Sequence, residues 1–411
     1  MTVDPRAEVR RDAPVELGDV GEDADLLARI RAEIRSSGPM PFARFMDLAL
    51  YDQDGGYYRS ATARAGRTGD FITAPELHPI FGATLASAVV DIWERLGRPD
   101  PFVVHEHGAG DGALAVALLG ELTASPLGDV ARYRPVEVDR RRVDALRERL
   151  RPAGLDGRLV TAAPSPATDG VVIANEVLDA LPVHRVRQRG DRLVEVAVDV
   201  DLDDDGSLVE VEVEPSTSAL AERLASEGIA LVDGQTAEIC LALDGWIATA
   251  SADLARGALL LIDYGAPATD LYDPVRRRDG TLRAYVRHQV HGDPYRHVGR
   301  QDLTAHVDVT AVERAAQRVG LSTLGITTQA EALVSLGIEG RLQAIQADPS
   351  TTFEGYALVR SSLMRMLDPA AMGRFRVMVF GRDWPEAGVA GAAADPLRIL
   401  SFRQPARATG R

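Results

Sequence analysis

The sequence predicts an α/β fold built around a largely parallel β-sheet. Residues 170–176 and 258–263 are continuous apolar runs that end in polar residues, as strands buried on both faces do. A third apolar stretch, 102–107, runs into three glycines at alternate positions and then into the helical run 113–119. Strands that alternate with helices in this way are expected to pair in parallel, with the helices covering the sheet.

The other elements follow in chain order. Residues 24–36, 41–50 and 79–96 have helical apolar spacing, and the last of these segments ends at Gly97 and Pro99. Apolar and polar residues alternate between 191 and 214 around an acidic turn at 203–206, which predicts a two-stranded hairpin rather than a calcium loop. Helices are expected over 237–256 and 310–319, and a late strand over 375–380.

Composition excludes several classes of function. The formal charge of −15 argues against nucleic acid as the main partner, since a phosphate backbone needs a basic face, and suits a basic substrate instead. All 46 basic residues are arginine, which removes lysine Schiff-base chemistry. The sequence contains no run of 18 apolar residues, so no membrane span is expected. The N-terminal segment lacks the apolar stretch of a secretory signal. Cys240 is the only cysteine, so no intrachain disulfide can form, and a cytoplasmic location is expected.

The glycine-rich turn is the strongest functional signal. Glu106, Gly108, Gly110 and Gly112 form E-x-G-x-G-x-G between a strand and a helix. Glycines allow positive φ and leave no Cβ between the main chain and a ligand, and the helix that follows offers free N–H groups. The pattern resembles the turn of S-adenosylmethionine (SAM) dependent methyltransferases, which touches the methionine portion and the ribose. Residues 108–113 also fit the dinucleotide pattern G-x-G-x-x-A, but Glu106 and the third glycine favour SAM.

Two acids follow the next predicted strand. The strand-like stretch 133–139 contains Glu137 and ends at Asp139, about where a second strand presents a carboxylate to ribose hydroxyls. Glu137 is the first choice for that role and Asp139 the second. Either acid would serve SAM or NAD, because both ligands carry a ribose diol.

Motifs over residues 28–381 are similar, in unbroken order, to the MidA family, whose mitochondrial members are complex I assembly factors acting as protein arginine methyltransferases. The matching blocks are 38–42 (GPMPF) with Met46, 56–58 (GYY), 69–76 (GDFITAPE), 81–82 (FG), the glycine turn, 175–183 (NEVLDALPV), 263–265 (DYG), 280–285 (GTLRAY) with His288, 301–308 (QDLTAHVD), 325–337 and 372–375 (MGRF). The resemblance implies a Rossmann-like class I SAM-dependent methyltransferase core with a seven-stranded sheet, an N-terminal helical cap and an inserted β-hairpin/helical region. It implies SAM as cofactor, S-adenosylhomocysteine as product, and no metal.

With that resemblance, the chain divides into four parts. Residues 1–25 are expected to be a disordered leader and 26–100 the helical cap. Residues 101–385 would form the methyltransferase core, with an insertion at about 186–236 and a substrate-side region at about 266–345. Residues 386–411, rich in Ala, Gly and Pro, are expected to be a loose tail.

The resemblance also assigns the block 69–76 to cofactor contact, with Gly69, Asp70, Thr73 and Pro75 as its contributors, and Asn175 at the end of the fourth strand as a further contact. Asp70 and Thr73 are plausible hydrogen-bonding partners for a nucleoside. The alternative is structural: 69–70 reads as a turn, Pro75 as a helix start, and Asn175 as a helix cap.

Methyl transfer from a sulfonium is an in-line displacement in which alignment supplies most of the acceleration. A guanidinium acceptor must be held by carboxylates. Glu176 and Asp179 follow the fourth strand three residues apart, so one helical turn would bring them together as guanidinium holders. Asp179 could instead cap the next helix.

Four further residues are candidates for the substrate cleft: Tyr264, Arg283, Tyr285 and His288. Tyr264 could also simply pack against its neighbours. His306 lies near several polar residues, but these do not form a metal-ligand pattern, so a structural role is favoured.

Two departures from the family pattern bear on specificity. Asp111 stands in the glycine turn where the family commonly has a basic residue, and Val177 and Leu178 replace an aromatic pair. The leading hypothesis is methylation of arginine in a protein or peptide. The alternatives are a small-molecule or peptide methyltransferase acting on another nucleophile, a SAM-binding assembly or chaperone protein with little catalysis, and, least favoured, an NAD-dependent enzyme. A homodimer is one possible assembly.

Overall fold

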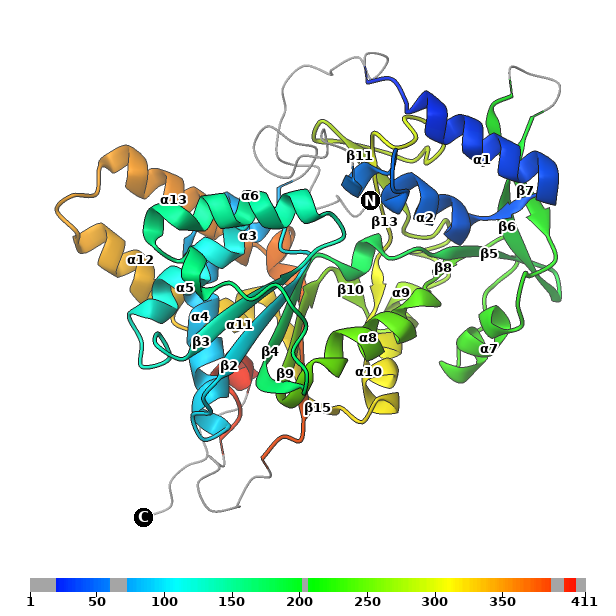
Figure 1. Cartoon of the computed structure of the whole chain (residues 1–411). Helices are drawn as coiled ribbons and strands as arrows, with labels where there is room; N and C mark the ends of the chain where they lie inside the picture. The colour runs from blue at the N-terminus through cyan, green and yellow to red at the C-terminus, as the bar shows by residue number, and fades with distance from the viewer. Residues whose placement is uncertain (1–19, 60–71, 202–205, 386–394, 404–411) are drawn as a thin grey trace.

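The computed structural model of the chain describes residues 20–59, 72–201, 206–385 and 395–403. The elements form a larger lobe around a six-stranded sheet and a smaller lobe around a five-stranded sheet (Figure 1). The first two helices of the expected cap, α1 (Ala24–Ser37) and α2 (Phe42–Tyr51), lie with the expected insertion in the smaller lobe, on the right of the view. They lie above its sheet, and α7 (Ala219–Ser226) lies below it.

The six-stranded sheet has the order β15-β16-β9-β4-β2-β3. Four neighbours, β9, β4, β2 and β3, are parallel, whereas β16 is antiparallel to both of its neighbours, β9 and β15. The strands are β2 (Phe102–His107), β3 (Ala131–Val136), β4 (Thr168–Asn175), β9 (Leu254–Asp263), β15 (Ser322–Thr328) and β16 (Arg376–Arg382). The predicted strands at 102–107, 170–176, 258–263 and 375–380 are therefore confirmed, and β15 is an additional strand.

The predicted seven-stranded sheet is wrong by one strand. Beyond β3, a single parallel bridge between Tyr133 and Leu159 occupies the place of a seventh strand. The chain then runs to β4 through residues 161–167, which include Pro164 and Pro166. Proline has no N–H to give to a ladder, so this segment does not continue the pairing.

Helices cover both faces of this sheet. One face packs against α3 (Ala74–Leu77), α4 (Ile80–Arg95), α5 (Ala113–Thr123) and the C-terminal helices α11 (Gln329–Ser335), α12 (Ile338–Ala347) and α13 (Phe353–Leu367). Helix α6 (Arg140–Leu150) lies beside α5. The other face packs against α8 (Ala242–Ala252) and α10 (Val309–Arg318). Short 3-10 turns cover Arg151–Ala153, Asp156–Arg158, Leu178–Ala180 and Met372–Arg374.

The predicted helix 310–319 is confirmed by α10, but the one predicted over 237–256 is correct only in its centre. Its centre is α8, its start belongs to strand β8 (Thr236–Ile239), and its end is the first part of β9.

The smaller lobe combines three separated stretches of the chain. Its main sheet has the order β1-β6-β5-β8, and β7 also pairs with β6, antiparallel to it. The strands are β1 (Met40–Pro41), β5 (His184–Arg189), β6 (Arg192–Val200), β7 (Leu208–Val213) and β8 (Thr236–Ile239). The predicted hairpin is confirmed as β6–β7; residues 202–205 at its tip lie outside the described residues.

Two small sheets and five helical segments complete this part of the fold. Strands β11 (Arg283–Val286), β12 (Gln289–His291) and β13 (Asp302–Thr304) form one sheet, and β10 (Gly265–Ala266) pairs with β14 (Val307–Asp308). The helical segments are α1 (Ala24–Ser37), α2 (Phe42–Tyr51), the 3-10 turn η3 (Tyr57–Arg59), α7 (Ala219–Ser226) and α9 (Ala268–Leu271).

The structure revises the expected helical cap at 26–100. Helices α1 and α2 share a hydrophobic core with β6, β11 and β13, so they belong to the smaller lobe. Helix α4 instead packs against α5 and the six-stranded sheet. The cap is therefore not one unit, because the apolar faces of its helices are buried in two different cores.

Both chain ends also differ from expectation where they are described. Residues 20–25 belong to the fold rather than to a disordered leader: Asp23 caps α1 and forms an ion pair with Arg300. In the expected loose tail, residues 398–403 form a 3-10 turn, η8, and Leu397 and Ile399 are buried against the larger lobe. Residues 1–19, 386–394 and 404–411 lie outside the described residues. No helix in the described ranges has the length and apolarity to cross a membrane.

Candidate active site

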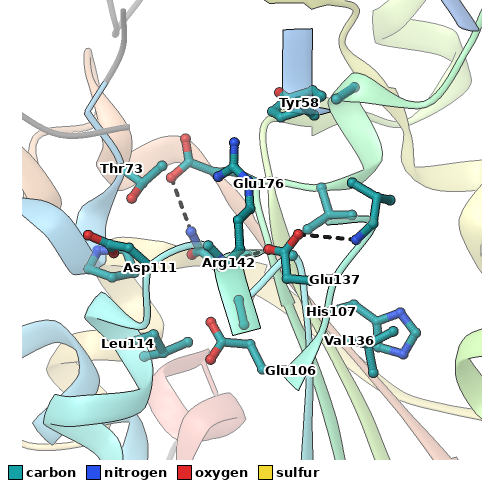
Figure 2. Close-up of a pocket in the computed structure, with 18 of the residues that line it drawn as sticks. Tyr58, Thr73, Glu106, His107, Asp111, Leu114, Val136, Glu137, Arg142 and Glu176 are labelled. Atoms are coloured by element: carbon teal, nitrogen blue, oxygen red, sulfur yellow. Dashed lines mark hydrogen bonds between the residues drawn. The ribbon is translucent and has the colours of Figure 1, made fainter. Parts of the chain in front are cut away.

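A cavity of about 490 Å³ opens where the two lobes meet, at the carboxyl ends of the parallel strands. The glycine turn follows β2, Glu137 follows β3, and Glu176 follows β4, so the sheet brings them to one edge. In Figure 2, Glu106, Glu137 and Glu176 surround the open space, with Thr73 on one side and Tyr58 on the side opposite Glu106. The lining comprises Tyr51, Tyr58, Thr73, Pro75, Glu76, Glu106, His107, Gly108, Ala109, Gly110, Asp111, Ala113, Leu114, Val136, Glu137, Val138, Arg142, Asn175, Glu176, Val177, Ala180, Leu181, Pro182, Trp246 and Thr249.

The glycine turn needs its glycines for different reasons. Gly108, Gly110 and Gly112 have φ values of 69°, 57° and 88°, in the left-handed region that disfavours other residues. A Cβ on Gly108 would lie 2.7 Å from Cγ2 of Val177, and one on Gly112 would lie 2.8 Å from Cγ of Leu146. A Cβ on Gly110 would meet nothing within 4 Å. The turn is therefore packed tightly on the β4 loop at Gly108 and is open toward the cavity at Gly110.

This difference predicts unequal effects of two matched substitutions. Gly108→Ala is expected to lower the free energy of unfolding by about 2–4 kcal/mol, and Gly110→Ala by about 1 kcal/mol. Both substitutions strain the left-handed backbone, but only the Cβ at position 108 would collide with Val177. Urea unfolding of the unliganded protein measures both. Equal losses would show that the contact with Val177 relaxes without cost.

The two ribose candidates behave differently. Oε1 of Glu137 accepts the N–H of Gly110 at 2.5 Å, and its carboxylate lies on the cavity wall. Asp139 instead caps α6 by accepting the N–H of Arg141 and does not line the cavity. Burial raises the pKa of Glu137 above its ordinary value, against the opposing effect of Arg142. The structure thus places the first choice, Glu137, where a bound ribose could meet it.

Glu106 gives the best indication that the cavity holds a polar ligand. Its side chain is 4% exposed, it lines the cavity, and Oε2 has no hydrogen-bond partner among the described residues. Burial, together with the charges of Glu137 and Asp111, raises its pKa well above the usual range. A buried carboxyl oxygen without a partner is costly in a folded protein. A ligand N–H or O–H group would satisfy it, so the residues present fit a nucleoside or amino-acid moiety.

The N-terminal block reaches the cavity through α3. Thr73 and Glu76 form a capping box at the start of this short helix, with the N–H of Thr73 donating to Oε2 of Glu76 at 3.0 Å. Thr73, Pro75 and Glu76 all line the cavity, so the cap also orients a third acidic side chain toward it. Gly69 and Asp70, the other predicted contacts of this block, lie outside the described residues.

The buried carboxyl group of Glu76 is expected to make the stability of the unliganded protein depend on pH. Burial raises its pKa from 4.5 to about 7, although the hydrogen bonds from Thr73 lower it; the charges of Asp111 and Glu176 raise it further. A raised folded-state pKa means that its contribution to stability is full below pH 4.5 and is lost as pH rises through 7. Between pH 5 and 8, the unliganded wild type is expected to lose on the order of 2 kcal/mol relative to Glu76→Gln. Thermal unfolding of both proteins at each pH is the measurement; parallel curves would contradict the assignment.

Glu176 is held in a strained conformation at the end of β4. Its φ is 54°, which a non-glycine residue adopts only when surrounding contacts hold it there. Its N–H donates to the carbonyl of Ile262 at 2.8 Å, and Nδ2 of Asn175 donates to its carboxylate at 3.2 Å. The strain lies at the residue expected to meet the acceptor, which is where functional sites often store it.

The carboxylate of Asp263, at the end of β9, holds this turn. Its Oδ2 accepts three successive N–H groups, those of Val177 (3.1 Å), Leu178 (2.9 Å) and Asp179 (3.3 Å). Asp263 is 1% exposed, so these bonds form in a buried environment. Asp263, which belongs to the matching block 263–265, therefore fixes the backbone that follows Glu176.

The structure separates the two predicted guanidinium holders. Residues 178–180 form a 3-10 turn, not a turn of α-helix, and Asp179 is 2% exposed and absent from the cavity lining. The hydroxyl of Tyr264 donates to Oδ2 of Asp179. The expectation that both carboxylates face the acceptor is therefore corrected: only Glu176 reaches the cavity.

The predicted substrate residues also lie elsewhere. Tyr264 is buried between His306 and Phe375. Arg283 and Tyr285 lie in β11, and His288 follows it in the β11–β12 turn; none of the three lines the cavity. This correction follows from the path of the chain, which turns residues 266–308 toward the core of the smaller lobe.

Sequence reasoning missed several lining residues. Tyr51 and Tyr58 come from the smaller lobe, and Trp246 and Thr249 come from α8. His107 packs edge to face on Trp246, and burial lowers its pKa to about 4, so it is neutral near pH 7. The block 56–58 is one of the matching motifs, but nothing in it indicated that Tyr58 lines the cavity. Within the ranges that the structure describes, no cluster of three or more His, Cys, Asp or Glu could hold a metal.

Fold and site together define a SAM-dependent methyltransferase of class I. Residues 84–327 match the family described as "Putative S-adenosyl-L-methionine-dependent methyltransferase". The chain belongs to this family, which is the MidA family.

Solved structures and curated relatives agree with this assignment. The chain is similar to a COG1565 superfamily member from Burkholderia thailandensis bound to S-adenosyl-homocysteine, with 36% identity, a TM-score of 0.80, and coverage of 91% of this chain and 96% of that chain. It is similar to the Drosophila melanogaster protein named "Protein arginine methyltransferase NDUFAF7 homolog, mitochondrial", at 28% identity over 92% of this chain and 88% of the relative. The Rattus norvegicus protein arginine methyltransferase NDUFAF7 is 29% identical over 85% of this chain and 82% of its own length.

Proposed function

We propose that this methyltransferase acts on an arginine guanidinium nitrogen of a protein or peptide. The observation that carries the proposal is Glu176, a carboxylate fixed in a strained turn at the end of β4 and open to the cavity. Carboxylates are the groups that recognise guanidinium ions in bidentate geometry. The names of the distant relatives, protein arginine methyltransferases, support the same acceptor.

The charge of the cavity also favours a cationic acceptor. Among the described residues, five carboxylic side chains line it, those of Glu76, Glu106, Asp111, Glu137 and Glu176, against one arginine, Arg142. Burial raises the pKa of Glu76, Glu106 and Glu137 in the unliganded protein, so these carboxyls are partly protonated there, and a bound cation would favour their ionised forms. A guanidinium would find partners there, whereas an anionic acceptor would be repelled.

The residues divide between two tasks in this proposal. Gly108, Gly110, Glu106 and Glu137 would hold the cofactor, whose sulfonium supplies the methyl group when bound. Glu176 would accept N–H bonds from the acceptor and turn one nitrogen toward the methyl group. A methylated guanidinium remains a cation, so the reaction releases one proton, which Glu176 would take and pass to solvent.

Incubation of the purified chain with labelled SAM and an arginine-containing peptide tests the proposal. Transfer of label to the guanidinium, found by mass spectrometry of the digested peptide, is the expected result, and a matched peptide with citrulline in place of arginine should stay unlabelled. Label on another atom would show a different acceptor. Binding of S-adenosylhomocysteine without any turnover would favour the assembly or chaperone alternative. The cytoplasmic location, the homodimer and the exclusion of nucleic acid remain predictions from the sequence.

A further inference from the structure

Two tyrosines from the smaller lobe form one wall of the cavity. Tyr51 ends α2 and Tyr58 lies in η3, and both side chains line the cavity. Their rings stack with centroids 5.5 Å apart and an interplanar angle of 21°. Figure 2 shows Tyr58 on the opposite side of the cavity from Glu106 and Leu114, which come from the larger lobe.

The hydroxyl groups of both rings are already used. The hydroxyl of Tyr51 donates to the carbonyl oxygen of Ala180 at 3.0 Å, and that of Tyr58 donates to Oδ1 of Asp302 at 2.8 Å. Burial and the charge of Asp302 raise the pKa of each phenol well above the usual range. Neither tyrosine is therefore suited to act as a base, and what they offer a ligand is the ring.

The setting makes these rings attractive to a cation. Asp302 is fully buried behind Tyr58, and a phenol that donates to a carboxylate carries more electron density in its ring. Glu176 lines the same cavity from the end of β4. A cation entering between the two lobes would meet aromatic rings from the smaller lobe and a carboxylate from the larger lobe.

We infer that Tyr51 and Tyr58 form the subsite that binds the cationic side chain of the acceptor by cation–π contact, with Glu176 as its anionic partner. The inference rests on the proposed function, because it names the part of the cavity that holds the guanidinium. It makes the smaller lobe the source of acceptor recognition, while the glycine turn, Glu106 and Glu137 of the larger lobe serve the cofactor.

Kinetics of two substitutions at one position test the inference. Tyr58→Leu, which removes the ring, is expected to raise KM for an arginine peptide about tenfold. It should leave kcat, and Kd for S-adenosylhomocysteine, within about threefold of wild type. Tyr58→Phe keeps the ring and should change KM less than Tyr58→Leu does. Tyr356→Leu, on α13 away from the cavity, is the matched control and should behave as wild type. If Tyr58→Leu fails to fold, Tyr51→Leu replaces it.

A binding experiment separates failure of the inference from failure of the proposed function. Calorimetry with S-adenosylhomocysteine present compares n-butylguanidinium with neutral n-butylurea. Binding of the cation alone, lost in Tyr58→Leu, supports the subsite even if no arginine peptide is methylated. Equal binding by wild type and Tyr58→Leu, or no binding of the cation by wild type, overturns it. Methylation of arginine with an unchanged KM in Tyr58→Leu likewise overturns the subsite while the proposed function stands.

Discussion

Glu176→Gln is expected to lower kcat by about 10²–10³-fold and to leave Kd for S-adenosylhomocysteine within about threefold. The amide keeps the shape of the carboxylate but not its charge, so it can neither pair bidentately with a guanidinium nor take up the released proton. Cofactor affinity should persist because the glycine turn, Glu106 and Glu137 lie on other strands. Single-turnover kinetics with an arginine peptide, together with calorimetry, measure the two quantities separately.

Glu148→Gln is the matched control, since Glu148 is an exposed carboxylate on α6 that pairs only with Arg151 in the described contacts. It should change neither quantity. If Glu176→Gln retained wild-type kcat, the carboxylate at the end of β4 would not handle the acceptor. If it lost S-adenosylhomocysteine instead, Glu176 would belong to the cofactor site.

Asp263→Asn is expected to give the second largest effect, through Glu176 rather than through the substrate. Four N–H groups, those of residues 177, 178, 179 and 264, donate to its carboxylate. Loss of the buried charge should lower the free energy of unfolding by about 2 kcal/mol. The same change should lower kcat by about 10–100-fold, because the strained turn would lose the contacts that fix it.

The split between these quantities distinguishes positioning from plain stabilisation. Asp169→Asn, at the start of β4 and paired with Arg256, removes a carboxylate from the opposite end of the same strand and should leave kcat unchanged. Measured well below its unfolding temperature, Asp263→Asn should still be slow. If its kcat equalled that of wild type under those conditions, Asp263 would only stabilise the fold.

The parts of the site carried by short, local signals could be predicted from the sequence. The strand, the three glycines and Glu106 lie within ten residues, and Glu137 follows one strand later, so their positions at the sheet edge follow from parallel pairing alone. Glu176 was found in the same way, at the end of a continuous apolar strand.

Contacts between distant segments could not be predicted. Asp263 accepts a hydrogen bond from the N–H of Val177, 86 residues away, and no local sequence pattern indicates that bond. Asp179 was misplaced because three-residue spacing brings side chains together only in an α-helix, and the segment forms a 3-10 turn after a left-handed residue. Tyr51 and Tyr58 reach the cavity only because α1 and α2 fold against strands that follow much later in the chain.

This arrangement affects the order in which the protein can fold during synthesis. The core that receives α1 and α2 includes Val198 and Val200 of β6 and Leu303 of β13. Leu26 and Leu303 belong to this core and are separated by some 280 residues. During synthesis on the ribosome, α1 and α2 are therefore made long before the last strand of their core. Until these strands are made, the amphipathic helices expose their apolar faces, which favours association with other unfolded chains. The acceptor side of the cavity is thus expected to be completed late, after the larger lobe has acquired its first strands.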